Sequence, residues 1–399
     1  MNQIQSLRLF YLDWLRVSAF AILIIANSFE VFTQHSWWIK NSETNIVIDH
    51  ILIFFRQWRM PLLFLISGAA VALILKKRTA IQFIDDRFIR ILVPLIAGML
   101  LIIPPQIYFI WKFEGYTQTF GQFYLDLLDF KWFPQGNFHW LHLWYLAFIF
   151  IFSISVLPLM FLLRLWKIKT LLDHTATYIC TPYILFPVMM ILQIPYFTAT
   201  LVNLNDNLTS LIYYFPYFLF GFLFLTQQAI SQAILKYRWL ALALGMITSL
   251  ALYVIFWMAN DTQGYIDLGF SQDTSYLSLR LLLTSLNNWF WAICLIGFAH
   301  RYLNFGHSAL NYANKVVYPF YIFHQTVIII LAYYVIRLNI SAFFKFNLIF
   351  GGTFLSIWLL YELVLKRSGM TKLMFGIKTD IRIKPLEGLF QREARRQSA

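Results

Sequence analysis

The chain has little charge, almost no cysteine and none of the short motifs that mark several common enzyme classes. Of its 399 residues, only 12% are charged and two are cysteines, whereas 60% are hydrophobic and 19% are aromatic. This balance excludes an ordinary soluble domain and indicates a polytopic membrane protein. Both cysteines, Cys180 and Cys294, lie in apolar runs, where packing is their expected role.

No G-x-S-x-G motif, P-loop, glycine-rich dinucleotide turn or Cys-x-x-Cys pair occurs in the sequence. Hydrolase, nucleotide-driven pump and redox functions are therefore without support. The net charge of +13 is concentrated in short loops and the C-terminal tail, as the positive-inside rule predicts. We therefore expect membrane lipid, and not nucleic acid, to surround the chain.

Apolar windows of about 20 residues predict an all-α bundle of about ten membrane-spanning helices. Basic residues gather in alternate loops and in the tail, which places both termini in the cytoplasm. We expect a single membrane domain over residues 1–366 and a basic cytoplasmic tail over 367–399. The windows lie near residues 13–34, 46–75, 88–111, 140–163, 177–199, 208–226, 238–258, 277–300, 315–336 and 343–365.

The first window carries a polar stripe. Arg16 and Asn27 are eleven positions apart, so on a helix they share a face and lie about 16 Å apart along the axis. Asp13 lies one turn before Arg16, and Glu30 continues the stripe beyond Asn27. Polar groups in hydrocarbon are costly unless they face protein or water, so this stripe predicts one wall of an internal site.

The second window places Arg56, Arg59 and Ser67 where they can share a helical face. Arginines inside a membrane need carboxylate, phosphate or water partners. Two interpretations stay open: a buried ion pair with Glu30, or a site that binds phosphates or a carboxylate.

Three of the eight histidines are candidates for chemistry. His139 and His142 are one turn apart at the start of the fourth window. They either orient a polar substrate at the mouth of the site or cap the helix at the membrane interface. No carboxylate or thiol completes a metal-ligand set there, so we expect no metal. His324 lies near the centre of the ninth window, where it is a candidate general base or a structural residue.

These residues fall in segments that resemble the bacterial acyltransferase type 3 family of polytopic membrane enzymes, and in particular a branch that includes the membrane-glucan succinyltransferases. The matching segments occur in the family's order and cover nearly the whole chain. They read YLDWLR, WWIKNSET, WRMPLLFLISG, RFIRILVPLIAGMLLIIPPQIYF, HLWYL and YPFYIFHQT.

The resemblance implies a bacterial inner-membrane enzyme that moves an acyl group from cytoplasmic acyl-CoA to a carbohydrate or cell-envelope glycan. Acyl-CoA would be a co-substrate, with no tightly bound cofactor. Arg16 matches an arginine linked with the donor, and Arg56 or Arg59 matches a second arginine of the donor region. His142 and His324 match recurrent histidines.

One position departs from the family pattern. The family has a histidine eleven residues after the first-span arginine, where it is the presumed general base, and this chain has Asn27 there. Asparagine cannot take a proton near neutral pH, and loss of a general base costs roughly 10²- to 10⁴-fold in rate. We expect His324, or secondarily Glu30, to replace it.

The resulting hypothesis is a membrane acyltransferase that transfers an acyl group of the acetyl or succinyl class. His324, Asn27 and Glu30 form its catalytic set, and His142, Trp144 and His139 bind the acceptor. The donor is bound by Asp13, Arg16, Arg56, Arg59 and Ser67. The alternative is a transporter or binding protein that keeps the fold but has lost the base.

Overall fold

The computed structural model describes residues 9–164, 181–202, 204–259 and 277–377, and it is helical with no β-strand in these ranges. Nine helical segments in the described part are long and apolar enough to cross a membrane. The expected all-α polytopic bundle is confirmed, and the chain is an integral membrane protein. These segments are Phe10–Phe32, Ile46–Leu75, Ala80–Phe113, Leu141–Leu159, Asp206–Leu225, Gln228–Ile255, Ser278–Tyr302, Ser308–Val335 and Ala342–Leu365.

The window near 177–199 begins outside the described residues, and its described part forms two short helices in place of one long span. These are α10 (Pro182–Ile191) and α11 (Ile194–Leu201), each of which begins with a proline in its first turn. Proline is tolerated there because the first turn has no intrahelical partner for its missing N–H. The cytoplasmic placement of the termini stays a prediction.

The chain divides into two compact units that interleave along the sequence. The first contains Met1–Leu23, Ile46–Leu73 and Val156–Asn314, and the second contains Ile24–Asn45, Ile74–Ser155 and Lys315–Ala399. Helix α1 (Phe10–Phe29) and helix α16 (Ser308–Val335) each contribute residues to both units. The expected domain boundary at residue 366 stays a prediction.

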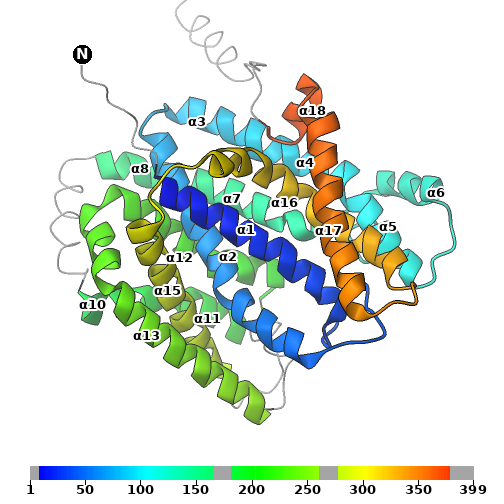
Figure 1. The fold of residues 1–399 in the computed structure, drawn as a ribbon. Helices are drawn as coiled ribbons and strands as arrows, with labels where there is room; N and C mark the ends of the chain where they lie inside the picture. The colour runs from blue at the N-terminus through cyan, green and yellow to red at the C-terminus, as the bar shows by residue number, and fades with distance from the viewer. Residues whose placement is uncertain (1–8, 165–180, 203, 260–276, 378–399) are drawn as a thin grey trace, which may run out of the picture. The chain divides into compact units, whose positions relative to one another are not determined.

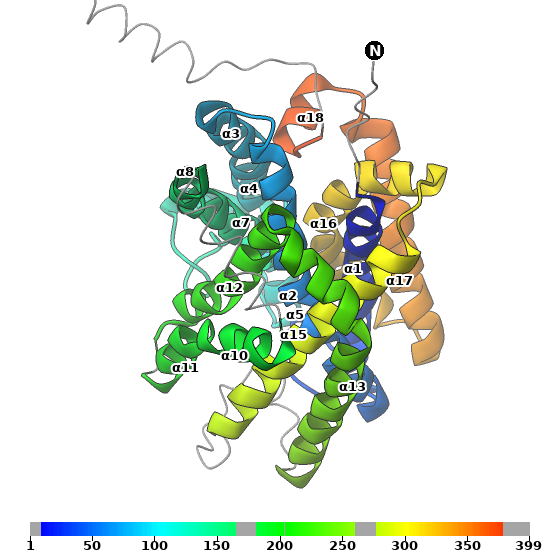
Figure 2. The ribbon, with the colours of Figure 1, turned by 90° about the vertical axis from the view of Figure 1, so that its left-hand side faces the viewer.

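The first unit is built mainly from long apolar helices. Helices α13 and α15 lie side by side in both ribbon views (Figures 1 and 2). The helices of this unit, apart from the start of α1, are α2 (Ile46–Leu75), α8 (Leu157–Arg164), α10, α11, α12 (Asp206–Thr226), α13 (Gln228–Ala259) and α15 (Leu277–Tyr302).

Helices α2 and α12 touch backbone to backbone at two glycines. A Cβ on Gly68 would meet the carbonyl oxygen of Phe218, and one on Gly221 would meet that of Leu65, each at 1.9 Å. No real Cβ approaches a backbone atom so closely. Small residues that allow close helix approach are typical of membrane bundles, where packing must replace the hydrophobic effect.

The second unit contains a span assembled from several pieces. Helix α3 (Ala80–Arg87) starts at a capping box made by Thr79 and Gln82, passes through a wider turn at Phe88–Leu92, and continues as α4 (Val93–Leu101) and α5 (Ile103–Phe113). The other helices of this unit, besides the parts of α1 and α16, are α6 (Phe120–Leu125), α7 (Trp144–Ser155), α17 (Ala342–Leu360) and α18 (Gly369–Met374).

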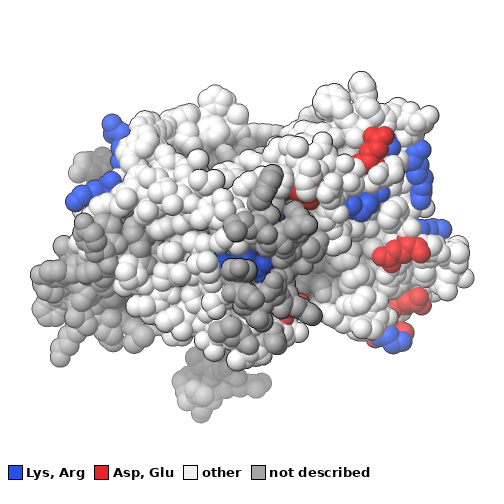
Figure 3. Space-filling view, turned by 90° about the horizontal axis from the view of Figure 1, so that it is seen from below, with Lys and Arg blue, Asp and Glu red and all other residues white. Residues whose placement is uncertain are grey.

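One face of the molecule carries few charged side chains. On the face drawn in Figure 3 most of the described surface is neither acidic nor basic. Many large apolar side chains are exposed on the spans, for example Ile247, Leu250 and Phe354, each more than half exposed. An apolar exterior of this kind is what hydrocarbon requires of membrane-spanning helices.

Candidate active site

His324 is buried on α16 in the second unit, with both ring nitrogens in contact with protein groups. Its Nδ1 lies 2.6 Å from the carbonyl oxygen of Tyr321. Because a carbonyl only accepts, Nδ1 carries the proton and donates it. In the neutral ring Nε2 is then an acceptor, and the amide Nδ2 of Asn27 lies 3.0 Å from it. The Asn27 amide therefore donates to the nitrogen of His324 that would act as a base.

A second contact fixes the orientation of the Asn27 amide. Its Nδ2 also lies 3.4 Å from Oε1 of Gln325, the residue after His324. An amide nitrogen has two hydrogens, so it donates one to each partner. Rotation of the amide by half a turn would place its oxygen against another oxygen. The structure thus brings the Asn27 and His324 of the sequence hypothesis together and adds Gln325, which the hypothesis did not contain.

His142 lies beside His324, with 5.2 Å between their ring centroids. Its Nε2 is 2.9 Å from the carbonyl oxygen of Ile322, so Nε2 carries the proton and Nδ1 has a free lone pair in the neutral ring. His142 is 8% exposed, and within the described part of the chain its Nδ1 has no hydrogen-bond partner. A buried acceptor left unpaired costs about 1–3 kcal/mol, so this nitrogen is suited to a hydroxyl donor.

The two histidines are held by one stretch of α16. The hydroxyl of Tyr321 donates to the backbone oxygen of His142 at 2.5 Å, while the Tyr321 carbonyl accepts the hydrogen bond from Nδ1–H of His324. Ile322 fixes the tautomer of His142 through its carbonyl. Both imidazoles therefore have fixed orientation, as an acid–base site requires.

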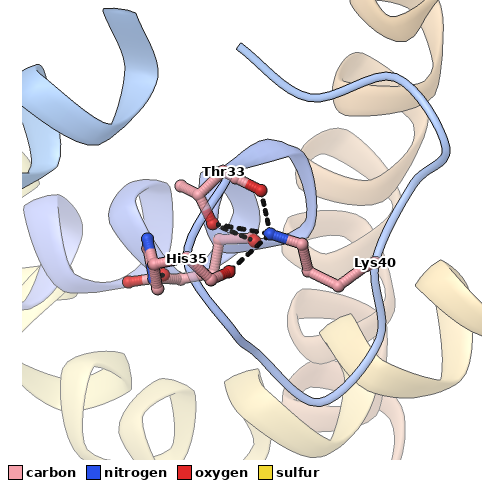
Figure 4. Close-up of polar contacts among 4 residues, drawn as sticks. Thr33, His35 and Lys40 are labelled. Atoms are coloured by element: carbon pink, nitrogen blue, oxygen red, sulfur yellow. Dashed lines mark hydrogen bonds and ion pairs between the residues drawn. The ribbon is translucent and has the colours of Figure 1, made fainter. Parts of the chain in front are cut away.

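Glu30 pairs with a histidine that the sequence did not single out. Its Oε2 lies 2.7 Å from Nε2 of His35, and their side chains are 5% and 1% exposed. Figure 4 shows the segment that follows: the Lys40 ammonium donates to the carbonyls of Thr33 and His35 and to the Thr33 hydroxyl. These contacts fold the chain after α1 around His35, which gives Glu30 a structural partner.

A buried lysine ties the same segment to α17. Lys345 is 6% exposed, and its ammonium donates to Oδ1 of Asn41 at 3.0 Å and to the carbonyl of Ile336 at 2.9 Å. A buried cation is stable only when hydrogen-bonded, so these two acceptors hold it in place. The expected pairing of Glu30 with Arg56 or Arg59 stays a prediction.

The expected donor residues of the first span lie in the first unit. The Arg16 guanidinium donates to Oδ1 of Asp13 at 2.9 Å and to Oδ1 of Asn314 at 2.6 Å. About a third of the Arg16 side chain is exposed, so further N–H groups can reach a ligand. Asn314 was not expected, because only folding brings it to Arg16.

The second-span residues differ in burial. Arg59 is 7% exposed, whereas Arg56 and Ser67 are partly exposed. Their shared role in donor binding stays a prediction.

A polar network inside the first unit also escaped the sequence analysis. The amide nitrogen of Asn287 on α15 donates to the amide oxygen of Gln57 on α2. The amide oxygen of Asn287 accepts from the hydroxyls of Thr248 and Ser249 on α13, each at 2.8 Å. Asn288 donates to the hydroxyl of Tyr213 on α12. The adjacent asparagines within an apolar window were a usable signal, because polar groups in a membrane find one another.

The expected acceptor residues His139 and Trp144 flank His142 in sequence. The backbone N–H of Leu141 donates to Nδ1 of His139 at 2.7 Å, and burial lowers the pKa of His139 to about 4. The ring is therefore neutral at physiological pH. Trp144 begins α7 and packs its ring on Phe148, with 5.0 Å between the centroids.

The sequence of the chain matches a known protein family. A family model described as an acyltransferase domain matches residues 9–362. Proteins called glucans biosynthesis protein C from Shigella dysenteriae serotype 1 (strain Sd197) and from Escherichia coli strains O6:K15:H31 and K12 are each 21% identical over 363 residues, which cover 84% of this chain and 86% of theirs. No solved structure matches the chain.

Proposed function

The chain belongs to the acyltransferase domain family, and from that membership we propose that it transfers an acyl group from cytoplasmic acyl-CoA to a carbohydrate hydroxyl at the bacterial inner membrane. The name of its relatives, glucans biosynthesis proteins, supports a glucan or similar glycan as the acceptor. The acyl group is of the acetyl or succinyl class. Acyl-CoA serves as a co-substrate.

The observation that carries this proposal is the free Nδ1 of His142 beside the His324–Asn27 pair. An acceptor hydroxyl that donates to Nδ1 gains a base whose other nitrogen is already fixed by Ile322. His324 is less available, because the Asn27 amide must leave its Nε2 before a hydroxyl can enter. We therefore assign the base to His142, in place of the His324 expected from sequence.

The transfer step is a substitution at the thioester carbonyl carbon and changes no oxidation state. The hydroxyl oxygen attacks the thioester carbonyl carbon, the new C–O bond forms, and the C–S bond breaks. The hydroxyl proton passes to Nδ1 of His142 and then to the departing thiolate, which leaves as the free thiol of CoA. General-base catalysis of this kind contributes roughly 10²- to 10⁴-fold.

The donor roles rest on residues of the first unit. Arg16 would bind a phosphate of CoA with the N–H groups that Asp13 and Asn314 leave unused. Arg56 and Arg59, with Ser67, would bind a donor carboxylate or the developing oxyanion. Trp144 and His139 would contact the acceptor.

Release of free CoA by the purified full-length chain tests the proposal. Acetyl-CoA and succinyl-CoA are supplied with a glycan-rich extract to wild type, His142→Gln, His324→Gln and Asn27→His. We expect wild-type turnover, a loss of about 10²-fold or more in His142→Gln, and a smaller loss in His324→Gln. The opposite ranking of the two histidine variants would return the base to His324.

One observation favours a second candidate function. The Asn27 amide occupies the basic nitrogen of His324, as it would in a transporter or binding protein that keeps the fold without the chemistry. Absence of CoA release from wild type, combined with uptake of a labelled glycan into proteoliposomes, would establish that alternative. Turnover gained only in Asn27→His would show that the donor site persists without its base.

A further inference from the structure

The segment between α5 and α7 contains a tight turn held in strained backbone. Phe130 and Leu141, at its two ends, have φ of 50° and 36°, in the left-handed region that non-glycine residues avoid. Between them the backbone N–H of Phe133 donates to the carbonyl of Phe138. The backbone N–H of Phe138 donates in turn to the carbonyl of Lys131, and both distances are 3.1 Å. Strain of this kind persists only where the surrounding structure enforces it, and it occurs often at ligand sites.

A glycine makes the turn possible. A Cβ on Gly136 would meet the carbonyl oxygen of Lys131 at 2.3 Å, so a larger residue would push the two arms of the turn apart. The N–H of Gly136 donates to the carbonyl of Trp132 at 3.0 Å. The turn therefore holds Trp132 at a defined position.

Trp132 is the centre of an aromatic surface. Its ring lies 4.5 Å from that of His139 and 5.1 Å from that of Trp140, which it meets at a right angle. Phe133 packs against Trp38 from the segment after α1, with 5.7 Å between ring centroids. Trp132 nevertheless keeps 38% of its surface exposed, so packing fixes the indole without covering it.

Polar groups accompany these aromatic rings, one on His139 itself and two on residues close to Trp132 in sequence. Because Nδ1 of His139 accepts from Leu141, the neutral ring carries its proton on Nε2, which is a donor. Asp129 and Lys131 form an exposed ion pair at 3.0 Å next to Trp132 in sequence. Exposed aromatic rings with donors and acceptors at their edge suit a ligand that presents C–H groups on one face and hydroxyls at its rim.

We propose that Trp132, His139 and Trp140 form a binding platform for a sugar ring of the acceptor glycan. A pyranose stacks its C–H face on Trp132 and places its hydroxyls toward His139 and the Asp129–Lys131 pair. His139 precedes His142, the proposed base, by three residues, so the platform and the base belong to one stretch of the chain. This inference rests on the proposed function for the identity of the acceptor, while the platform itself is a carbohydrate site whether or not acyl transfer occurs.

Binding of glucose oligosaccharides to the full chain in detergent tests the platform without any acyl donor. Cello-oligosaccharides and malto-oligosaccharides are titrated by calorimetry against wild type, Trp132→Ala and Trp132→Phe. We expect at least one series to bind wild type, with affinity reduced about tenfold in Trp132→Ala and largely restored in Trp132→Phe. Trp239→Ala on α13, where the tryptophan is 59% exposed, is the matched control and should leave binding unchanged.

Three outcomes would overturn the inference: no binding of either series to wild type, equal binding by Trp132→Ala, or an equal loss in Trp239→Ala. A lipid-facing role for Trp132 is tested in nanodiscs with brominated lipid. The fluorescence of Trp132 is the difference between the emission of wild type and that of Trp132→Phe. If brominated lipid quenches this difference, the ring lies in the bilayer and the inference is overturned. If oligosaccharide binding depends on Trp132 but wild type releases no free CoA, the platform is supported and only the acyl transfer is refuted.

Discussion

The Glu30–His35 pair leads to a prediction that separates structure from catalysis. Glu30 was the second candidate base from sequence, but the structure gives its carboxylate to His35 at 2.7 Å, with both side chains at least 95% buried. We expect Glu30→Gln to keep most of the turnover, because the amide oxygen still accepts from His35. Its rate should fall by less than about tenfold, well below the 10²-fold or more expected for loss of a base.

The stability effects should form a graded series. A hydrogen bond to a charged group contributes about 1.5–3 kcal/mol and a neutral one about 0.5–1.5 kcal/mol, so Glu30→Gln should lower the free energy of unfolding by about 1 kcal/mol. Breaking a buried pair outright costs about 3–5 kcal/mol, which is the loss expected for Glu30→Ala. Glu30→Ala combined with His35→Ala should cost less than the sum of the two single changes, because the pair couples them.

Equilibrium unfolding in mixed detergent measures the stability series, and release of free CoA measures turnover. The two assays must be made on the same preparations. A Glu30→Gln protein of wild-type stability with turnover reduced by 10²-fold or more would refute the reasoning and make Glu30 the base. Strict additivity of Glu30→Ala and His35→Ala would show that the two residues do not interact.

Three further predictions follow from packing, burial and charge. Gly68→Ala should destabilise the chain by about 1–3 kcal/mol or more in thermal unfolding because it separates α2 from α12, whereas Gly351→Ala, whose Cβ meets no atom within 4 Å, should be neutral. Burial lowers the pKa of His139 from the usual value near 6.5 to about 4, so the unfolded chain binds more protons between these values. Stability should therefore fall as pH drops through this window, and His139→Gln should remove that part of the slope. Asn41→Ala should destabilise more than Lys345→Met in the same unfolding assay, because it leaves a buried ammonium with one acceptor fewer.

Much of the architecture follows from the composition and the spacing of apolar residues. A chain with 60% hydrophobic residues and long apolar windows must form helices in a membrane, since only helices and closed barrels satisfy their own backbone groups there. Nine of the windows correspond to helical segments among the described residues. The interrupted span Ala80–Phe113 and the short helices α10 and α11 were harder to predict, because hydropathy does not register where a helix breaks.

The polar residues of the first span show where sequence reasoning stopped. It identified Asp13, Arg16, Asn27 and Glu30 as a stripe on one helix, and it singled out His142 and His324 from depth and resemblance. It could not assign their partners, because Asn314, Gln325, His35 and Ile322 become neighbours only when distant segments meet.

The sequence by itself determined that the chain is a polytopic helical membrane protein and that several ionisable side chains lie within its spans, because hydropathy and helical period are local properties. The tertiary structure decided which nitrogen is free. His324 and His142 look alike in sequence, yet the Asn27 amide contacts Nε2 of His324, whereas Nδ1 of His142 is buried without a partner because the Ile322 carbonyl holds the proton on Nε2. That difference depends on hydrogen bonds between α1, the short helical turn Leu141–Leu143 and α16, and no pattern along the chain encodes a hydrogen bond between segments so far apart.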